Sequence, residues 1–192
     1  SLSTLKAFIP EDQLWPFTNS TVWNTHNTDY IKAEPRAFNR NQLMADQVEV
    51  LFGPEAANLP IEDFVLASQI SQAEAKKYFI ERMRLKKWRV TGLIWWNLLD
   101  GWPQISDAVV DYYFRKKLAF HYIRRSQQPV CLMMDEPAGW KARVVAANDT
   151  NTVKEISYKI TDEKGEILME GHVIAAPGEN VELGLLPVFA GA

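Results

Sequence analysis

Two tryptophans and two polar residues stand together in the middle of the chain. Trp96 closes the uncharged run 90–96, and Asn97, Asp100 and Trp102 follow it. An indole can stack on the C–H face of a sugar, while an amide and a carboxylate can bind its hydroxyl groups. We therefore predict that Trp96, Asn97, Asp100 and Trp102 are substrate-binding residues of a carbohydrate site. The alternative is that Trp95, Trp96 and Trp102 all belong to the core, with Asn97 and Asp100 as hydrogen-bond partners for their indole N–H groups.

The element that must position these residues is the run 90–96 itself. It is short and apolar, with Arg89 before it and a turn from Asn97 to Gly101 after it. Such a run is typical of a strand buried on both faces, as in parallel sheets covered by helices. Ligands bind at the carboxyl ends of strands in such sheets, which is where this pattern places the four residues.

Three helices are predicted around this strand. Asn39 is a suitable cap for a helix over 40–52, with Gly53-Pro54 as its stop. Pro60 opens a longer helix that extends to about Lys87, and a third covers 116–125. The long helix is expected to bury one apolar stripe, made of Phe64, Ala67, Ser71, Ala75, Phe79 and Met83. The cations near its end are expected to form a solvated helix terminus: Arg82, Arg84, Lys86, Lys87 and Arg89.

From Val130 onward the hydrophobic period changes to two. Turn-forming clusters separate five expected strands, which indicate an antiparallel sandwich. The domain boundary is therefore expected near Pro129, with domains over 1–129 and 130–192. The expected strands are 130–135, 140–147, 155–161, 167–174 and 181–186.

Composition argues against several functions. The net charge is −3 and there is no long basic block, so no nucleic-acid partner is expected. No apolar run reaches the length of a membrane span, so no membrane insertion is expected. Cys131 is alone and the histidines are far apart, so neither a metal nor another cofactor is expected. His26 is a further site candidate. Asp107 or Asp111 could be a ligand, but loop carboxylates are more often solvated surface, so we expect both to be solvated.

Four motifs lie close together from Gly92 onward: the run 92–103 (GLIWWNLLDGWP), Ile105-Ser106-Asp107, Asp111-Tyr112-Tyr113 and the run 116–125. Together they resemble glycoside hydrolase family 2, most closely its β-mannosidase-like branch. The resemblance implies an α/β plus all-β fold class: a partial (β/α)8 barrel, with its last strand and flanking helices, followed by an immunoglobulin-like antiparallel β-sandwich. Residues 1–129 would be the C-terminal portion of the barrel, and 130–192 a sandwich expected to be incomplete at five strands.

The resemblance also implies a function. Trp96 matches the sugar-contacting tryptophan at the end of the eighth strand, and Asp100 and Trp102 match the loop after it. The nucleophile and acid/base glutamates of the family would both precede Ser1, so no catalytic residue is assigned here. The chain is accordingly expected to be a C-terminal fragment of a retaining exo-β-glycosidase for terminal β-mannosides or β-galactosides, inactive by itself.

Two other functions fit the same residues. One is a non-catalytic carbohydrate-binding protein that uses the same aromatic side chains. The other is a protein-interaction module made of the helices and the sandwich. If barrel strands are missing, an apolar face lies open, so the isolated chain is also expected to self-associate.

Overall fold

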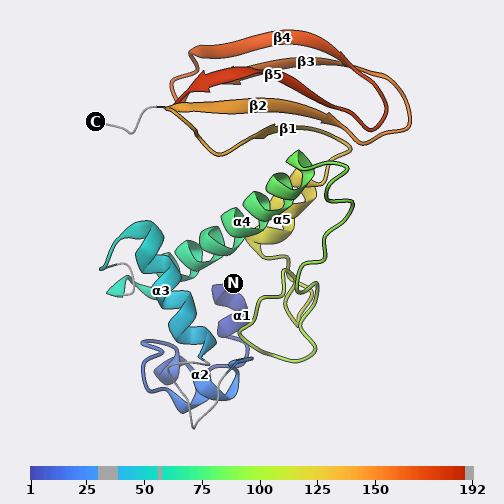
Figure 1. Cartoon of the computed structure of the whole chain (residues 1–192). Coiled ribbons are helices and arrows are strands. Elements are labelled where there is room, and N and C mark those ends of the chain that lie inside the picture. Colours follow the sequence, from blue (N-terminus) through green and yellow to red (C-terminus); the bar gives the residue numbers. More distant parts are fainter. Residues whose placement is uncertain (30–38, 56–57, 189–192) are drawn as a thin grey trace. The chain divides into compact units, whose positions relative to one another are not determined.

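The structure is a computed structural model that describes residues 1–29, 39–55 and 58–188. The chain folds into two compact units. Unit 1 comprises Ser1–Lys77 and Ile94–Ile123, and unit 2 comprises Tyr78–Leu93 and the chain from Arg124 onward. The described helices precede Val130 and the antiparallel strands begin there, as the sequence colours of Figure 1 show. No described helix has the length and apolar character needed to cross a membrane.

The helix predicted after Asn39 is confirmed. α3 spans Arg40–Phe52, and the Asn39 side chain accepts a hydrogen bond from the backbone N–H of Gln42 at 3.2 Å. Gly53 closes the helix with φ of 98°, a left-handed conformation that glycine adopts without steric cost. Shorter elements precede it: α1 Leu2–Leu5, η1 Glu11–Gln13 and α2 Thr21–Thr25.

The long helix is also confirmed, but its predicted stripe is wrong in the second half. α4 spans Ile61–Leu85, and Phe64, Ala67 and Ser71 are buried as predicted. Ala75 and Phe79 are exposed, whereas Ala73 and Ile80 are buried. Successive steps of four residues advance by about 40° beyond a full turn, so they leave a fixed face after a few steps. Ala73 and Ile80 share one face, which at about 100° per residue lies roughly opposite Phe64, so the second half of α4 buries a different face from the first.

Aromatic side chains form the core of unit 1. Trp23 is 1% exposed and its Nε1–H donates to the Leu14 carbonyl at 3.1 Å. Trp15 lies between Trp23 and Phe64, with ring centroids at 6.1 and 4.9 Å. Phe17 contacts the same rings. This cluster packs the N-terminal segment against the first half of α4.

Five antiparallel strands form two sheets in unit 2, so the five predicted strands are confirmed. One sheet has the order β1-β2-β5 and the other pairs β3 with β4. Ala146, Ile156 and Ala175, which come from both sheets, share one buried cluster, so the sheets pack face to face. α5, Leu118–Ser126, precedes the first strand (Figure 1). The strands are β1 Val130–Met134, β2 Lys141–Asn148, β3 Lys154–Thr161, β4 Ile167–Ala175 and β5 Asn180–Pro187.

A buried asparagine ties together the turns of these sheets. Asn148 at the end of β2 is fully buried, and its Nδ2 group donates to the carbonyls of Thr152, Ala175 and Ala176 at 2.9, 3.0 and 3.0 Å. Its Oδ1 accepts from the backbone N–H of Thr150 at 3.0 Å. The side chain therefore satisfies backbone groups that the two turns would otherwise leave unpaired.

The predicted solvated helix end is wrong for three of its five cations, which take part in ion pairs, whereas Lys86 and Arg89 are exposed as predicted. Arg84 and Lys87 both bind the Asp149 carboxylate, and Arg82 binds Asp135. The side chains of Arg84 and Lys87 are only 12% and 14% exposed. Burial acts to raise the pKa of Asp149, but the hydrogen bonds from Lys87 and Arg84 outweigh it and hold that pKa below its usual value.

The strand predicted over 90–96 is also wrong for this structure. No strand pairs with the segment among residues 1–29, 39–55 and 58–188, and Val90 forms only an isolated bridge with Lys87. Ile94 and Trp96 are 96% and 74% exposed. A strand buried on both faces needs neighbouring strands to take its backbone N–H and C=O groups. Without such neighbours, Ile94 and Trp96 remain in solvent, whereas Val90, Leu93 and Trp95 are half-buried.

Candidate functional site

The candidate site is the loop over 97–117, which follows the exposed Trp96. Backbone hydrogen bonds within this loop give it a compact fold. The backbone N–H of Val110 donates to the Leu98 carbonyl at 2.9 Å, and that of Asp100 donates to the Val110 carbonyl at 3.1 Å. In a third hydrogen bond, the backbone N–H of Lys117 donates to the Val109 carbonyl at 2.9 Å. The loop therefore has a defined shape although it contains no regular strand.

Asp100 lies in the interior of this loop rather than on its surface. The residue is 2% exposed, and its carboxylate accepts hydrogen bonds from Gln104 Nε2 at 2.7 Å and from Ser106 Oγ. The Lys117 ammonium lies 3.7 Å from the same carboxylate and donates to the Ser106 carbonyl at 3.2 Å. Burial lowers the pKa of Lys117, outweighing the opposing effect of the carboxylates around it. The contacts of Asp100 thus hold the loop together.

Trp102 is stacked on a histidine from far earlier in the chain. The indole and the His26 imidazole are separated by 5.1 Å between centroids with an interplanar angle of 24°. Phe8 also contacts the imidazole, at 4.5 Å. Trp102 nevertheless remains 42% exposed. The structure therefore brings together two residues that the sequence pattern suggested separately, and leaves much of the indole accessible.

Trp96 and Asn97 lie at the start of the loop. Trp96 is exposed, and its backbone carbonyl accepts a hydrogen bond from the Lys76 ammonium. Lys76 also lies over the Trp95 ring, 5.5 Å from its centroid. The peptide bond between Trp96 and Asn97 is cis. Asn97 Oδ1 is a buried acceptor without a hydrogen-bond partner among the described residues, so it has unused capacity for a donor.

The neighbouring carboxylates stabilise the loop and are not simply solvated. Asp111 is 1% exposed and accepts from Thr4 Oγ1 and, at 2.8 Å, from the Arg115 backbone N–H. The expectation of a solvated Asp111 is therefore wrong, because the turn needs an acceptor at that position. Asp107 is partly exposed and pairs with Arg40 at 2.8 Å.

The loop also borders a pocket that the sequence pattern did not predict. It has a volume of about 570 Å³ and includes Asp100 among its lining residues, but not Trp96, Asn97 or Trp102. Two adjacent tyrosines contribute to it, with ring centroids 5.4 Å apart in an edge-on arrangement. The tyrosine pair after Asp111 was the available signal. The lining residues are Leu99, Asp100, Gly101, Tyr112, Tyr113 and Phe114.

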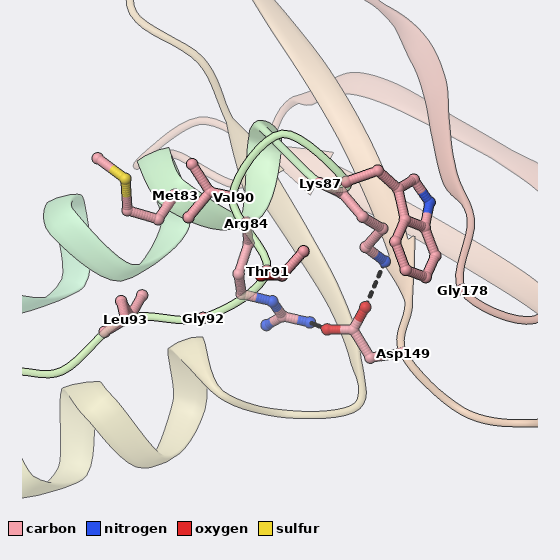
Figure 2. A pocket seen from close by; sticks show the side chains of 10 residues that line it. Met83, Arg84, Lys87, Val90, Thr91, Gly92, Leu93, Asp149 and Gly178 are labelled. Atoms are coloured by element: carbon pink, nitrogen blue, oxygen red, sulfur yellow. Dashed lines mark hydrogen bonds and ion pairs between the residues drawn. The ribbon is translucent and has the colours of Figure 1, made fainter.

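Unit 2 has a second pocket, of about 300 Å³, shown in Figure 2. Arg84 and Lys87 reach Asp149 from the end of α4, as the dashed lines mark. The remaining walls include Met83, Val90 and further residues of the segment that ends at Leu93. The charged side chains of this pocket, Arg84, Lys87 and Asp149, already pair with one another, so the pocket offers a ligand mainly apolar contacts.

Neither pocket has the features of a metal centre. Within the residues that the structure describes, no group of three or more His, Cys, Asp or Glu side chains could hold a metal ion. What the loop offers instead is exposed indole surface at Trp96 and Trp102 and one unpaired amide oxygen at Asn97. That combination suits a ligand with apolar C–H faces and hydroxyl groups.

Comparison by sequence links the chain to fungal glycosidases, although no family model matches it. It is 36% identical over 143 residues to β-mannosidase B of Thermothelomyces thermophilus, an alignment that covers 69% of this chain and 15% of that protein. It is 34% identical over 76 residues to β-mannosidase B of Aspergillus flavus, covering 38% of this chain and 9% of that protein. The chain thus spans a small part of the length of the curated relatives that it matches.

Comparison by structure gives neighbours of the same kind. The β-D-mannosidase of Dictyoglomus thermophilum superposes with a TM-score of 0.74 at 22% identity, over 98% of this chain and 22% of that one. The exo-chitosanase CsxA of Amycolatopsis orientalis superposes with a TM-score of 0.74 at 20% identity, over 100% of this chain and 23% of that one. At these identities the superpositions establish a shared fold.

Proposed function

We propose, from the membership of this chain in glycoside hydrolase family 2, that it supplies the sugar-binding loop of a larger retaining exo-β-glycosidase. The substrate class would be terminal β-mannosides or β-galactosides. The observation that carries the proposal is the 36% identity over 143 residues to a β-mannosidase B. The match covers 15% of that relative, so the proposed activity belongs to a larger protein of which this chain forms one part.

The fold that we propose for the intact protein is a (β/α)8 barrel followed by an immunoglobulin-like sandwich. Residues 1–129 would form the last part of the barrel, and 130–192 would belong to the sandwich. The five antiparallel strands in two packed sheets support the second assignment, since immunoglobulin-like domains have about seven strands in that arrangement. The uncharged segment 90–96 supports the first, because parallel neighbours would bury the exposed side chain of Ile94 and leave Trp96 at the carboxyl end of the strand.

Within that site, the exposed aromatic side chains would hold the sugar. Trp96 would stack on the C–H face of a pyranose, and Trp102 would present a second indole surface. Asn97 would use its unpaired Oδ1 to accept a hydrogen bond from a sugar hydroxyl. Asp100, whose carboxylate binds Gln104, Ser106 and Lys117, would act on the substrate through the loop that it holds.

The chemistry itself requires groups that this sequence does not supply. A retaining glycosidase uses two carboxyl groups about 5 Å apart, one as nucleophile and one as acid/base. The resemblance assigns both to glutamates that precede Ser1 in family order. The three loop carboxylates here, Asp100, Asp107 and Asp111, are each engaged in hydrogen bonds or ion pairs that shape the loop.

The test compares the 192-residue chain with the complete protein that contains it. Both are assayed with p-nitrophenyl β-mannoside, β-galactoside and β-glucosaminide, and the anomer first released is identified by proton NMR. We expect turnover with retention for the complete protein and no turnover above a heat-inactivated control for the chain. Sugar binding by a complete protein without turnover would instead favour a non-catalytic carbohydrate-binding protein. Turnover by the chain alone would contradict the assignment of catalysis to glutamates outside it.

A further inference from the structure

The imidazole of His26 lies in contact with two other rings in unit 1. Phe8 contacts it at 4.5 Å between centroids, and Trp102 stacks on it at 5.1 Å with an angle of 24°. Near-parallel rings at this separation are in favourable offset contact. A neighbour on one face of the indole limits the orientations that the Trp102 side chain can adopt.

A hydrogen bond fixes the histidine that makes this contact. His26 Nδ1 lies 2.6 Å from the carbonyl oxygen of Pro103, the residue directly after Trp102. A carbonyl can only accept, so Nδ1 carries the proton and donates. The imidazole is therefore attached to the same loop twice, through the indole face of Trp102 and through the backbone beside it.

The backbones of the two segments are also paired. The Ile105 N–H donates to the His26 carbonyl at 2.7 Å, and the Thr28 N–H donates to the Ile105 carbonyl at 3.3 Å. The Thr28 hydroxyl donates to the same carbonyl at 3.2 Å. These bonds hold the chain that directly follows His26 in register with the chain after Trp102, so the backbone that carries the imidazole is fixed to the loop.

We propose that His26 is a positioning residue that sets the orientation of the Trp102 indole for stacking on a pyranose sugar. This inference rests on the proposed function, because it treats Trp102 as a sugar contact. It adds that a residue of the segment after α2 determines how that contact is presented. His26 acts through Trp102 and takes no part in proton transfer to the sugar.

Two substitutions separate the two attachments of the imidazole. His26→Phe keeps an aromatic ring against Trp102 and removes the hydrogen bond to the Pro103 carbonyl. His26→Asn keeps a short donor near the Nδ1 position and removes the ring. His172→Asn is the matched control, because its side chain is 51% exposed and pairs only loosely, at 3.9 Å, with Glu155 on a neighbouring strand.

The first readout uses the 192-residue chain and does not depend on activity. The indole Nε1–H resonance of Trp102, assigned with Trp102→Phe, is followed by NMR while methyl β-mannoside or methyl β-galactoside is added. We expect a saturable shift that weakens by about three- to tenfold in apparent affinity in His26→Asn, as for loss of one aligned aromatic contact. His26→Phe should recover most of it, and His172→Asn should match the original chain.

The second readout uses the complete protein. We expect His26→Asn to raise KM by a similar factor with a smaller change in kcat, and His26→Phe to restore KM partly. Equal losses in both His26 variants together with a lowered melting temperature would show a structural role only, and would overturn the proposal. A Trp102 resonance that no sugar shifts would also overturn it. Sugar-dependent shifts of the Trp102 resonance, combined with no turnover by the complete protein, would support the positioning role of His26 and contradict the proposed hydrolase function.

Discussion

The Asp100 carboxylate lies 3.7 Å from the Lys117 ammonium, inside the loop that carries the exposed tryptophans. The Asp100 side chain is fully buried and that of Lys117 is 13% exposed. This pair joins the two ends of the loop, because Asp100 lies shortly after Trp96 and Lys117 directly precedes α5. The pair therefore links the position of the indoles to the start of the helix.

Lys117→Met should lower the free energy of unfolding by about 1–3 kcal/mol at neutral pH, because it leaves a buried carboxylate with neutral donors only. The pH dependence should change as well. Burial lowers the pKa of Lys117 from 10.5, so the unfolded chain binds more protons between the folded pKa and 10.5. Stability from this group therefore rises with pH in that window. Urea unfolding from pH 7 to 11 should show that rise in the original chain and its loss in Lys117→Met.

Lys116→Met is the control for that experiment, because Lys116 is exposed and lies over the Phe120 ring. It should change the free energy of unfolding by less than about 0.5 kcal/mol, as surface substitutions usually do. If Lys116→Met and Lys117→Met gave the same pH profile, the pair with Asp100 would contribute nothing specific.

Trp96→Ala should impair sugar turnover in the complete protein without unfolding it. The side chain is 74% exposed, so its removal should shift stability by less than about 0.5 kcal/mol. KM should rise, or kcat fall, because an indole no longer stacks on the sugar.

Trp23→Ala is the contrasting variant. Trp23 is 1% exposed, and its truncation should destabilise unit 1 by about 3–5 kcal/mol. Thermal unfolding with steady-state kinetics on both variants tests the distinction.

Asn148→Ala should be among the most destabilising single changes in unit 2. It leaves the carbonyls of Thr152, Ala175 and Ala176 without their side-chain donor in a buried position. We expect a loss of about 2–4 kcal/mol in urea unfolding followed by far-ultraviolet circular dichroism. Asn151→Ala, in the exposed part of the same turn, should be nearly neutral. Comparable losses at both positions would mean that the turn, and not the Asn148 side chain, carries the stability.

Asp149→Asn should make unit 2 less sensitive to acid. Burial opposes ionisation of Asp149, but hydrogen bonds from Lys87 and Arg84 dominate and lower its pKa from 3.8. The stability that this depression contributes is present above 3.8 and is lost as the pH falls through the folded pKa. Asp149→Asn should lose about 1 kcal/mol at pH 7, a modest value because the side chain is 38% exposed and screened by solvent.

The measurement is thermal unfolding between pH 2 and 7, with Glu163→Gln as the control in an exposed turn. The control should follow the original chain throughout. An Asp149→Asn curve that ran parallel to the original at every pH would contradict a role for its ionisation.

The isolated chain should self-associate through its exposed apolar side chains. Ile94 and Phe114 are 96% and 76% exposed, and Leu98 is 59% exposed. Clusters of such side chains in water favour association. Sedimentation velocity over a hundredfold concentration range should show a concentration-dependent increase in mass, reduced by Ile94→Lys. A monomer at every concentration would contradict the prediction.

The sequence by itself determined the elements whose signals are local. The Asn39 cap and the Gly53 stop define α3, because a cap bonds to backbone groups only a few residues away. The alternation of apolar residues after Val130 defines five strands in the same way, since successive side chains of a strand point to opposite faces. The motifs between Gly92 and Arg125 likewise indicated glycoside hydrolase family 2, in agreement with the similarity to a β-mannosidase B.

The tertiary structure decided everything that depends on distant partners. Asp100 is an interior carboxylate because Lys117 and Ser106 meet it there, and no spacing within the motif indicates that. His26 and Trp102 stack only because the backbone after α2 pairs with the loop at Ile105. The segment 90–96 has the composition of a buried strand, yet its Ile94 and Trp96 side chains are exposed, since burial depends on the neighbours that a strand finds and not on its own residues.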